Sequence, residues 1–176
     1  MHFLLEVIRW TGTASIRAWL DGVMDEREPV ERRPLNPSAR SSTRLGLGEV
    51  DIVAPGVLHV RLAGAVQVEH LEPMMFAAME QFVEGNRVIV AIDADDVHAY
   101  KSEVRKILQC WLRDIRPHAD GVWMLYRSPV IKMGIGLMNA FTGDLIRGFT
   151  DPEEFDAELA RVIREARQAE AELRAH

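Results

Sequence analysis

The densest group of side chains that could take part in chemistry follows a strongly apolar run, Val88–Ile92. It consists of Asp93, Asp95, Asp96, His98 and Tyr100. Paired carboxylates can hold Mg²⁺, and their mutual repulsion can raise one pKa so that the group serves as an acid or a base. Residues that follow a central strand of an α/β sheet commonly form its site. The simpler alternative is a solvated acidic loop that favours the N-terminus of the next helix through the helix dipole.

Other patterns that would indicate an enzyme are absent from the sequence. A magnesium-dependent phosphoryl-transfer receiver needs a lysine after a later strand, where this chain has Arg127-Ser128-Pro129. Gly134-Ile135-Gly136 lies inside a predicted helix and matches no phosphate-binding fingerprint, so these glycines are expected to allow close helix packing. The histidines His59, His70, His98 and His118 lack the spacing of a zinc site. We therefore predict no catalytic residue, no metal and no cofactor.

Composition narrows the class of protein further. A formal net charge of -6 argues against nucleic acid as the main partner, because phosphate binding needs a basic face. No stretch approaches the roughly 18 consecutive apolar residues of a membrane-spanning helix. Charged residues interrupt the N-terminal apolar run, which is a poor signal-peptide core, so a cytoplasmic location is expected. Cys110 is the only cysteine, and we expect it to be a buried, inert thiol.

Three regions are predicted along the chain. Residues 1–46 form an N-terminal arm, with a short amphipathic helix over residues 1–20 and a disordered linker rich in proline and charge. An alternative for the start is that Met24 is the true initiator. Residues 47–168 form the compact domain, and residues 169–176 form a charged helical tail.

The elements that must position the acidic group follow from hydrophobic periodicity and turn residues. Strands are predicted over Glu49–Val53, Val57–Leu62, Arg87–Ile92, Gly121–Tyr126 and Leu145–Phe149. Helices are predicted over Val68–Glu84, Tyr100–Ile115, Val130–Phe141 and from Pro152 onward. The order ββαβαβαβα indicates an α/β fold, with a mixed, mostly parallel sheet of about five strands flanked by about four helices.

Two local features of these elements carry specific expectations. Pro55-Gly56 between the first two strands suits a type II turn. The helix Val130–Phe141 is apolar except for Lys132 and Asn139. Its predicted inner stripe consists of Val130, Gly134, Leu137, Met138 and Phe141. A stretch of this kind suits the lining of a pocket, or contact with a membrane or a partner.

The element order and three short motifs together resemble one family over residues 47–165. The motifs are Val57–Gly64, a strand that ends in glycine; Val88–Asp93, a central strand that ends in aspartate; and Gly148–Phe155, the last strand leading into the last helix. They resemble the STAS domain, in its SpoIIAA-like (STAS/SEC14-like) group related to anti-sigma factor antagonists. The resemblance implies a STAS-like sheet and a regulatory module that binds a protein and has no chemistry of its own.

In the classical antagonists of that family, Asp-Ser-Ser-Gly follows the central strand and carries a phosphorylatable serine. These positions fall on Tyr100-Lys101-Ser102-Glu103, where only Ser102 matches. Ser102 is therefore a weak candidate phosphoacceptor, with an N-cap or exposed first-turn serine as the alternative. We expect this chain to lack the phospho-switch.

Three hypotheses about function follow. The first is a protein-interaction module whose partner, a regulator or a kinase-like protein, docks on a loop over residues 94–103 and on the adjoining helices. The candidate binding residues are Asp93, Asp95, Asp96, His98, Tyr100 and Lys101. The second is a domain that binds a lipid or another apolar ligand. The third and least favoured is a Mg²⁺-dependent enzyme that uses Asp93, Asp95 and Asp96. A homodimer is compatible with each.

Overall fold

A computed structural model describes residues 38–43 and 46–175. The predicted helix over residues 1–20 and the alternative start at Met24 lie outside these residues. In the described part of the chain, six strands form one sheet in the order β1-β2-β3-β4-β5-β6, so neighbours in sequence are neighbours in the sheet. The first three strands are antiparallel to one another, and β3 to β6 run parallel. The predicted mixed, mostly parallel α/β fold is confirmed.

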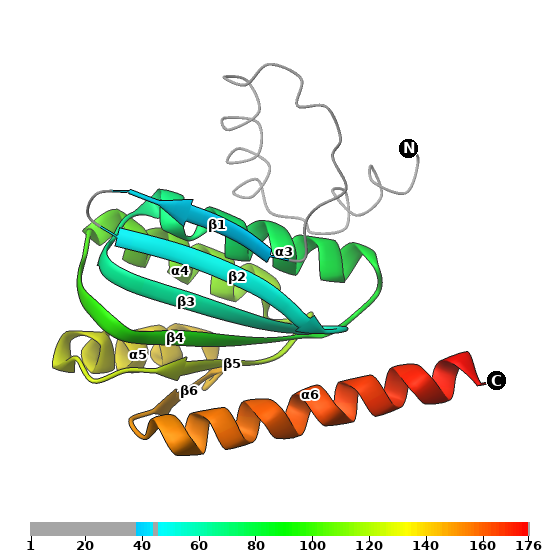
Figure 1. Ribbon diagram of the computed structural model, residues 1–176. Coiled ribbons are helices and arrows are strands. Elements are labelled where there is room, and N and C mark those ends of the chain that lie inside the picture. The colour runs from blue at the N-terminus through cyan, green and yellow to red at the C-terminus, as the bar shows by residue number, and fades with distance from the viewer. Residues whose placement is uncertain (1–37, 44–45, 176) are drawn as a thin grey trace. The chain divides into compact units, whose positions relative to one another are not determined.

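The strands and helices alternate from β3 onward. The strands are β1 (Ser38–Ser42), β2 (Gly46–Ala54), β3 (Val57–Val66), β4 (Val88–Tyr100), β5 (Ala119–Leu125) and β6 (Ile146–Phe149). The helices are the short 3-10 helix η1 (Val68–His70), α3 (Glu72–Val83), α4 (Ser102–Ile115), α5 (Pro129–Thr142) and α6 (Pro152–Arg174). Figure 1 shows α3 and α4 behind the sheet and α6 on its opposite face.

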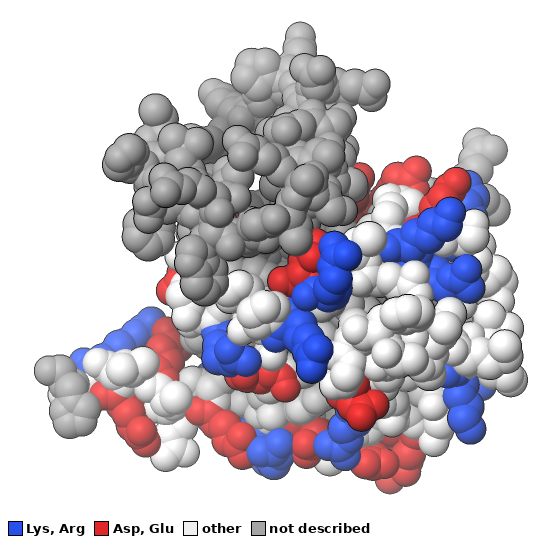
Figure 2. All heavy atoms as spheres, turned by 180° about the vertical axis from the view of Figure 1, so that it is seen from behind, with Lys and Arg blue, Asp and Glu red and all other residues white. Residues whose placement is uncertain are grey.

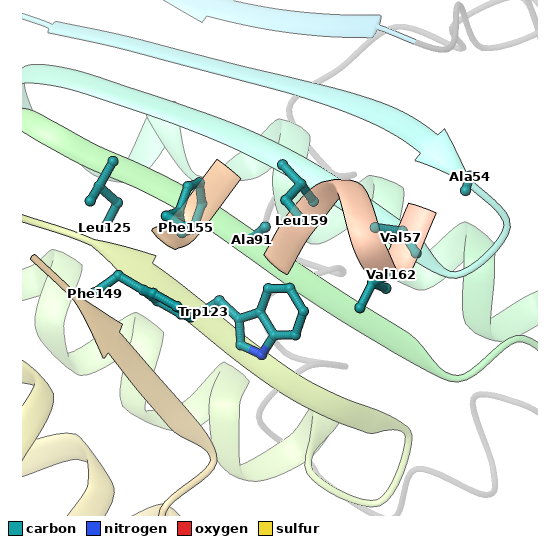
Figure 3. Packing of buried hydrophobic residues seen from close by; sticks show 9 residues of the cluster. All are labelled: Ala54, Val57, Ala91, Trp123, Leu125, Phe149, Phe155, Leu159 and Val162. Carbon is teal, nitrogen blue, oxygen red and sulfur yellow. The ribbon is translucent and has the colours of Figure 1, made fainter. Parts of the chain in front are cut away.

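Two layers of side chains hold these elements together. On one face, α6 packs Phe155, Leu159 and Val162 against alternate residues of the strands, among them Ala91 and Trp123 (Figure 3). The neighbouring residues of the same strands point to the other face, where Leu62, Ala94 and Met124 lie beside α4 and α5. The first half of β4 and most of β5 are apolar on both faces because helices cover both, as in most parallel sheets.

Several predicted local signals are found where the sequence placed them. Gly56 has a φ of 71°, as the third position of a type II turn requires. Gly143 ends α5 with a φ of 64°, in the left-handed conformation that favours glycine. Asp151 caps α6, since its carboxylate accepts the backbone N–H of Glu153 at 2.9 Å.

The structure corrects the extent of the predicted linker. Ser38–Ser42, within the segment predicted to be disordered, forms the edge strand β1 and pairs antiparallel with β2 from Ser42–Leu47 to Ser38–Asp51. This strand has no large apolar side chain, and the backbone hydrogen bonds that define it leave no trace in a hydrophobic pattern. The remainder of the predicted linker lies outside the described residues, apart from Thr43 and Gly46.

Cys110 is also not where it was expected. Its side chain is exposed on the outer surface of α4, whereas Trp111 and Leu112 are buried. Since α4 is strongly amphipathic, a shift of one residue along the helix moves a side chain by 100° around its axis. The adjacent apolar residues were therefore a poor guide to the burial of this cysteine.

Candidate functional site

The candidate site lies on a strand and not on a loop. β4 continues to Tyr100, so a single residue, Lys101, separates it from α4. The predicted recognition loop over residues 94–103 is therefore wrong. Its polar residues can lie in a strand because β5 pairs with β4 only as far as Asp93, whereas β3 remains paired up to Val66 opposite Tyr100. Beyond Asp93 the strand pairs on one side only within the described sheet, and its polar side chains reach solvent.

Two irregularities give this extended end of β4 an unusual spacing. The pairing steps from Arg61–Asp93 to Ala63–Asp96, and again from Gly64–Val97 to Ala65–Ala99, so β4 carries an extra residue at each step. An extra residue delays the alternation of the strand by one position. The next side chain on the same face therefore comes three residues later instead of two. Ala94, Val97 and Tyr100 thus all point to the side of α4 and α5, although they are three residues apart.

Two of the predicted carboxylates are paired with arginines, one in β3 and one that follows β5. Asp93 lies 3.9 Å from the guanidinium of Arg61 and accepts the backbone N–H of Asp95 at 3.1 Å. Asp95 pairs with Arg127, which follows β5, at 2.5 Å. The other carboxylate oxygen of Asp95 is buried without a hydrogen-bond partner among the described residues. These contacts hold the end of β4 against its neighbours.

The remaining predicted residues are exposed or half-buried. Asp96 and His98 are exposed on β4, and Lys101 and Ser102 are exposed at the start of α4. Lys101 occupies the N-cap position in an extended conformation, without a side-chain capping bond. Tyr100 is half-buried, and a methyl group at Gly134 of α5 would lie 3.2 Å from its hydroxyl oxygen. The structure thus brings the six predicted residues onto one strand end, with Tyr100 facing the helices.

The acids of the magnesium hypothesis lie along one strand end. Among residues 38–43 and 46–175, no three histidine, cysteine or acidic side chains gather closely enough to hold a metal ion. Asp93 and Asp95, two of the three acids in the magnesium hypothesis, each have an arginine as their partner. A carboxylate that is already neutralised by a guanidinium is a poor ligand for a hard cation.

A row of alternating charges crosses the sheet beside the site. Arg40 of β1 is paired in register with Glu49 of β2, Glu49 with Arg61 of β3, and Arg61 with Asp93 of β4. The Arg40–Glu49 ion pair measures 3.0 Å. Opposite charges on directly paired residues stabilise a sheet modestly and make its surface charged but locally balanced. Sequence reasoning missed this row because its members come from four strands.

On the other face, an apolar pocket of about 50 Å³ lies between the end of β4 and the helices α4 and α5. Ala94, Val97 and Tyr100 form its β4 wall, and Val104 and Ile131 are among the residues that the two helices contribute. Ligand pockets usually enclose about 300–1,000 Å³, so this one accommodates only a small group as it stands.

The structure corrects the predicted inner stripe of α5. Gly134 and Met138 are buried as predicted, together with Ile131, Ile135 and Thr142. Val130, Leu137 and Phe141 were also placed inside, but they are exposed. Because apolar residues occur on every side of this helix, its pattern alone does not select the buried face.

Comparisons with known proteins give similarity of fold and little more. No family model matches the chain. Its sequence is 24% identical over 118 residues to a pyridoxal kinase PdxY from Actinobacillus succinogenes, a match that covers 64% of this chain. The chain spans 38% of the length of that kinase.

Three solved structures are similar in fold. One is an uncharacterised protein of the DUF3478 family with a SpoIIAA-like fold from Shewanella loihica, with 15% identity, a TM-score of 0.45 and coverage of 73% of this chain and 98% of that one. The second is the anti-sigma factor antagonist SpoIIAA in its unphosphorylated form, with 14% identity, a TM-score of 0.47 and coverage of 62% and 94%. The third is an anti-sigma factor antagonist from Mycobacterium paratuberculosis, with 15% identity, a TM-score of 0.42 and coverage of 70% and 92%.

In the described part of the chain, no helix is both long enough and apolar enough to cross a membrane.

Proposed function

We propose that this chain is a non-enzymatic interaction module that binds a regulatory protein through the extended end of β4 and the first turn of α4. The observation that carries the proposal is the placement of Asp96, His98 and Lys101. They are exposed on a strand end that is held by pairing with β3 and by two arginine–aspartate ion pairs. Charged groups on a rigid support favour specific recognition because little conformational entropy is lost on binding.

The charges of this surface also indicate what kind of partner suits it. Asp96 and His98 are exposed, and the neighbouring row of paired charges ends at Asp93. A partner surface with complementary charges would be steered to this edge, and the ion pairs around it would fix the register. A kinase-like or sigma-related regulator, as the family resemblance suggests, is the proposed class of partner.

Phosphorylation is not part of the proposed mechanism. Ser102 is exposed in the first turn of α4, where a phosphate would gain from the helix dipole. Glu103 follows it directly, and its negative charge would oppose the phosphate. We therefore expect Ser102→Ala and Ser102→Glu to bind the partner as tightly as the natural chain.

The test of partner binding uses the full chain as bait in extracts of its own source cells. Asp96→Lys reverses one exposed charge at the site, and Asp156→Lys makes the same change at an exposed position of α6. A genuine partner is retained by the natural chain and by Asp156→Lys, and is lost with Asp96→Lys. Purified, that partner should show at least tenfold weaker binding to Asp96→Lys. If every captured protein is retained equally by all three chains, the proposal is wrong.

The apolar pocket favours a second candidate, a domain that binds a small apolar ligand. Its lining is apolar and its volume is about 50 Å³, so a ligand chain would have to displace Tyr100 or separate α4 from α5. Native mass spectrometry of the purified chain checks this directly. A bound ligand of constant mass that disappears in Gly134→Leu, a substitution that fills the pocket, would support the second candidate over the first.

A further inference from the structure

Arg105 of α4 differs from the other arginines of this protein. It is half-buried, whereas every other arginine in the described part of the chain is exposed. Most of those arginines are paired with a carboxylate, as Arg61 and Arg127 are. Figure 2, which shows the molecule from behind, has blue and red side chains next to one another over much of the visible surface.

The charge of Arg105 has no such compensation. Among residues 38–43 and 46–175, its side chain has neither an ion pair nor a hydrogen bond. Acidic side chains are plentiful, since the chain has a net charge of -6. Partial burial of an unpaired charge costs free energy, so the position of Arg105 favours a negatively charged group from outside the chain.

Arg105 also lines the apolar pocket between the end of β4 and the helices α4 and α5. It is the only charged residue in that lining. Because the pocket wall is apolar and Arg105 is half-buried, its methylene stem forms part of the wall and its guanidinium group lies at the mouth. The pocket therefore combines an apolar interior with one positive charge at its opening.

Further positive charge lies at the same end of α4. Lys101 occupies the N-cap position one turn before Arg105, and residues four apart lie on the same side of a helix. Lys101 is exposed and has no ion pair with any described residue. The N-terminus of α4 adds the positive end of the helix dipole. Glu103 is the acidic residue of this turn, but residues two apart do not face each other.

The hydroxyl group of Tyr100 is the other polar group of the lining. It lies against Gly134 and makes no hydrogen bond within the described part of the chain. A hydroxyl can donate a hydrogen bond to a carboxylate, and a guanidinium group does so more strongly. Tyr100 and Arg105 thus offer an anion two donors beside an apolar interior.

We infer that the pocket binds an amphiphilic monocarboxylate, whose apolar chain lies between α4 and α5 and whose carboxylate pairs with Arg105. The inference rests on the second candidate function, the binding of a small apolar ligand, and names the chemical class of that ligand. The donors of a guanidinium group match the two oxygens of a carboxylate. A phosphate monoester matches less well, because it carries nearly two negative charges and a single charged residue lines the pocket.

The pocket is small, so a bound chain has to move part of its wall. Met124 and Met138 belong to that wall, and unbranched methionine side chains adapt readily to a new neighbour. We therefore expect a short apolar chain, and octanoate serves as the probe.

Titration of the full chain with octanoate at neutral pH, followed by NMR of isotope-labelled methionine methyl groups, tests the inference. Octanoate should shift the signals of Met124 and Met138, which line the pocket. Met133 is the internal control, because it is 77% exposed on α5 and reports adventitious contact with apolar surface. Octanol has the same chain without the charge, and it should bind at the same two methionines at least about tenfold more weakly.

Variants of Arg105 test the role of its charge. Arg105→Gln should weaken octanoate binding by about tenfold or more and leave octanol binding unchanged, because only the ion pair is lost. Arg105→Glu should reverse the preference, so that octylammonium binds more tightly than octanoate. Arg164→Gln is the matched control, since it removes the same charge from an exposed position of α6 and should bind both ligands as the natural chain does. Thermal unfolding checks that each variant is folded.

The results that would overturn the inference also separate it from the function on which it rests. Equal affinity for octanoate and octanol at Met124 and Met138 would leave an apolar-ligand domain in which Arg105 selects nothing. Octanoate binding that Arg105→Gln leaves unchanged would show that this arginine only covers apolar surface. Shifts at Met133 alone, or no shifts with either ligand, would overturn both the inference and the second candidate function.

Discussion

Tyr100, the last residue of β4, lies against Gly134 in the middle of α5. A methyl group added at Gly134 would stand 3.2 Å from the hydroxyl oxygen of Tyr100, so the absence of a side chain at this position is what allows the contact. The contact joins the extended end of the central strand to α5. Gly136, two residues further along α5, has no such role, because nothing lies within 4 Å of the place where its Cβ would be.

The two glycines of α5 should therefore respond differently to alanine. Gly136→Ala should raise the free energy of unfolding by about 0.5–1 kcal/mol, since alanine is the better helix former and meets no obstacle. Gly134→Ala should raise the free energy of unfolding by less, or lower it, because the side chain of Tyr100 has to shift to make room for the methyl group. Urea unfolding of both variants and of the natural chain measures the two changes. Equal gains at both positions would contradict the close contact at Gly134.

Gly48 of β2 should not tolerate a side chain. A Cβ there would lie 2.0 Å from the backbone carbonyl oxygen of His70 in η1, a clash that no rotation of a side chain can relieve. We expect Gly48→Ala to lower the free energy of unfolding by about 1–3 kcal/mol, as overpacking in a core does. Gly121→Ala in β5 is the control, because there the nearest atom belongs to the side chain of Trp123 at 3.2 Å. A Gly48→Ala chain no less stable than Gly121→Ala would disprove the packing of η1 on β2.

The row of alternating charges should be sensitive to salt. Arg61→Glu places a third acidic side chain between Glu49 and Asp93, with which position 61 is paired in register on either side. Repulsion between directly paired like charges should cost about 1 kcal/mol at low ionic strength. Most of that cost should disappear at about 1 M salt, where the screening length is about 3 Å. Arg61→Gln removes the charge without reversing it, so it should lower the free energy of unfolding by less than Arg61→Glu does. A loss that is independent of salt would argue against an electrostatic origin.

The ion pairs that join α6 to β6 should make stability depend on pH. Hydrogen bonds from the guanidinium of Arg161, together with the charges of Arg161 and Arg147, hold the pKa of Glu158 below its ordinary value of 4.5. Because the folded-state pKa is lowered, the stabilisation is complete above about pH 4.5 and is lost as the pH falls through the lowered value.

Glu158→Gln should thus be less stable than the natural chain at pH 7, and the difference should shrink steadily as the pH drops below 4.5. Thermal unfolding over a pH series measures the difference. Glu165→Gln provides a comparison, since Glu165 pairs with Arg161 but not, among the described ion pairs, with Arg147, and should have a smaller effect. A difference between Glu158→Gln and the natural chain that stays constant down to low pH would show that the carboxylate charge is not what stabilises this contact.

Local sequence signals predicted most of the elements. Alternating apolar residues in β3, the continuous apolar run of β4 up to Ile92, and the Asp151-Pro152 start of α6 all indicated the elements that the structure contains. These signals are readable because they depend on neighbours in sequence: a turn glycine, a helix cap or a period of two or about four residues. Asp93, Asp95, Asp96, His98 and Tyr100 lie together on one end of β4, and their role in binding stays a proposal.

Three features depended on contacts between distant segments and could not be read from the sequence. β1 exists because its backbone pairs with β2, whatever its side chains are. The two bulges of β4 space Ala94, Val97 and Tyr100 three residues apart, a period that suggests a loop or a helix, and only pairing with β3 keeps this stretch a strand.

The orientation of α5 is the third of these features. Its composition is apolar nearly all round, so the two hydrogen bonds between Asn139 and Ile146 and the contact of Gly134 with Tyr100 decide which face is buried. The sequence by itself determined the order of strands and helices and the position of the polar residues along them, because local periodicity and turn chemistry carry that information. Only the tertiary structure decided which side chains face solvent, because burial depends on what packs against each element.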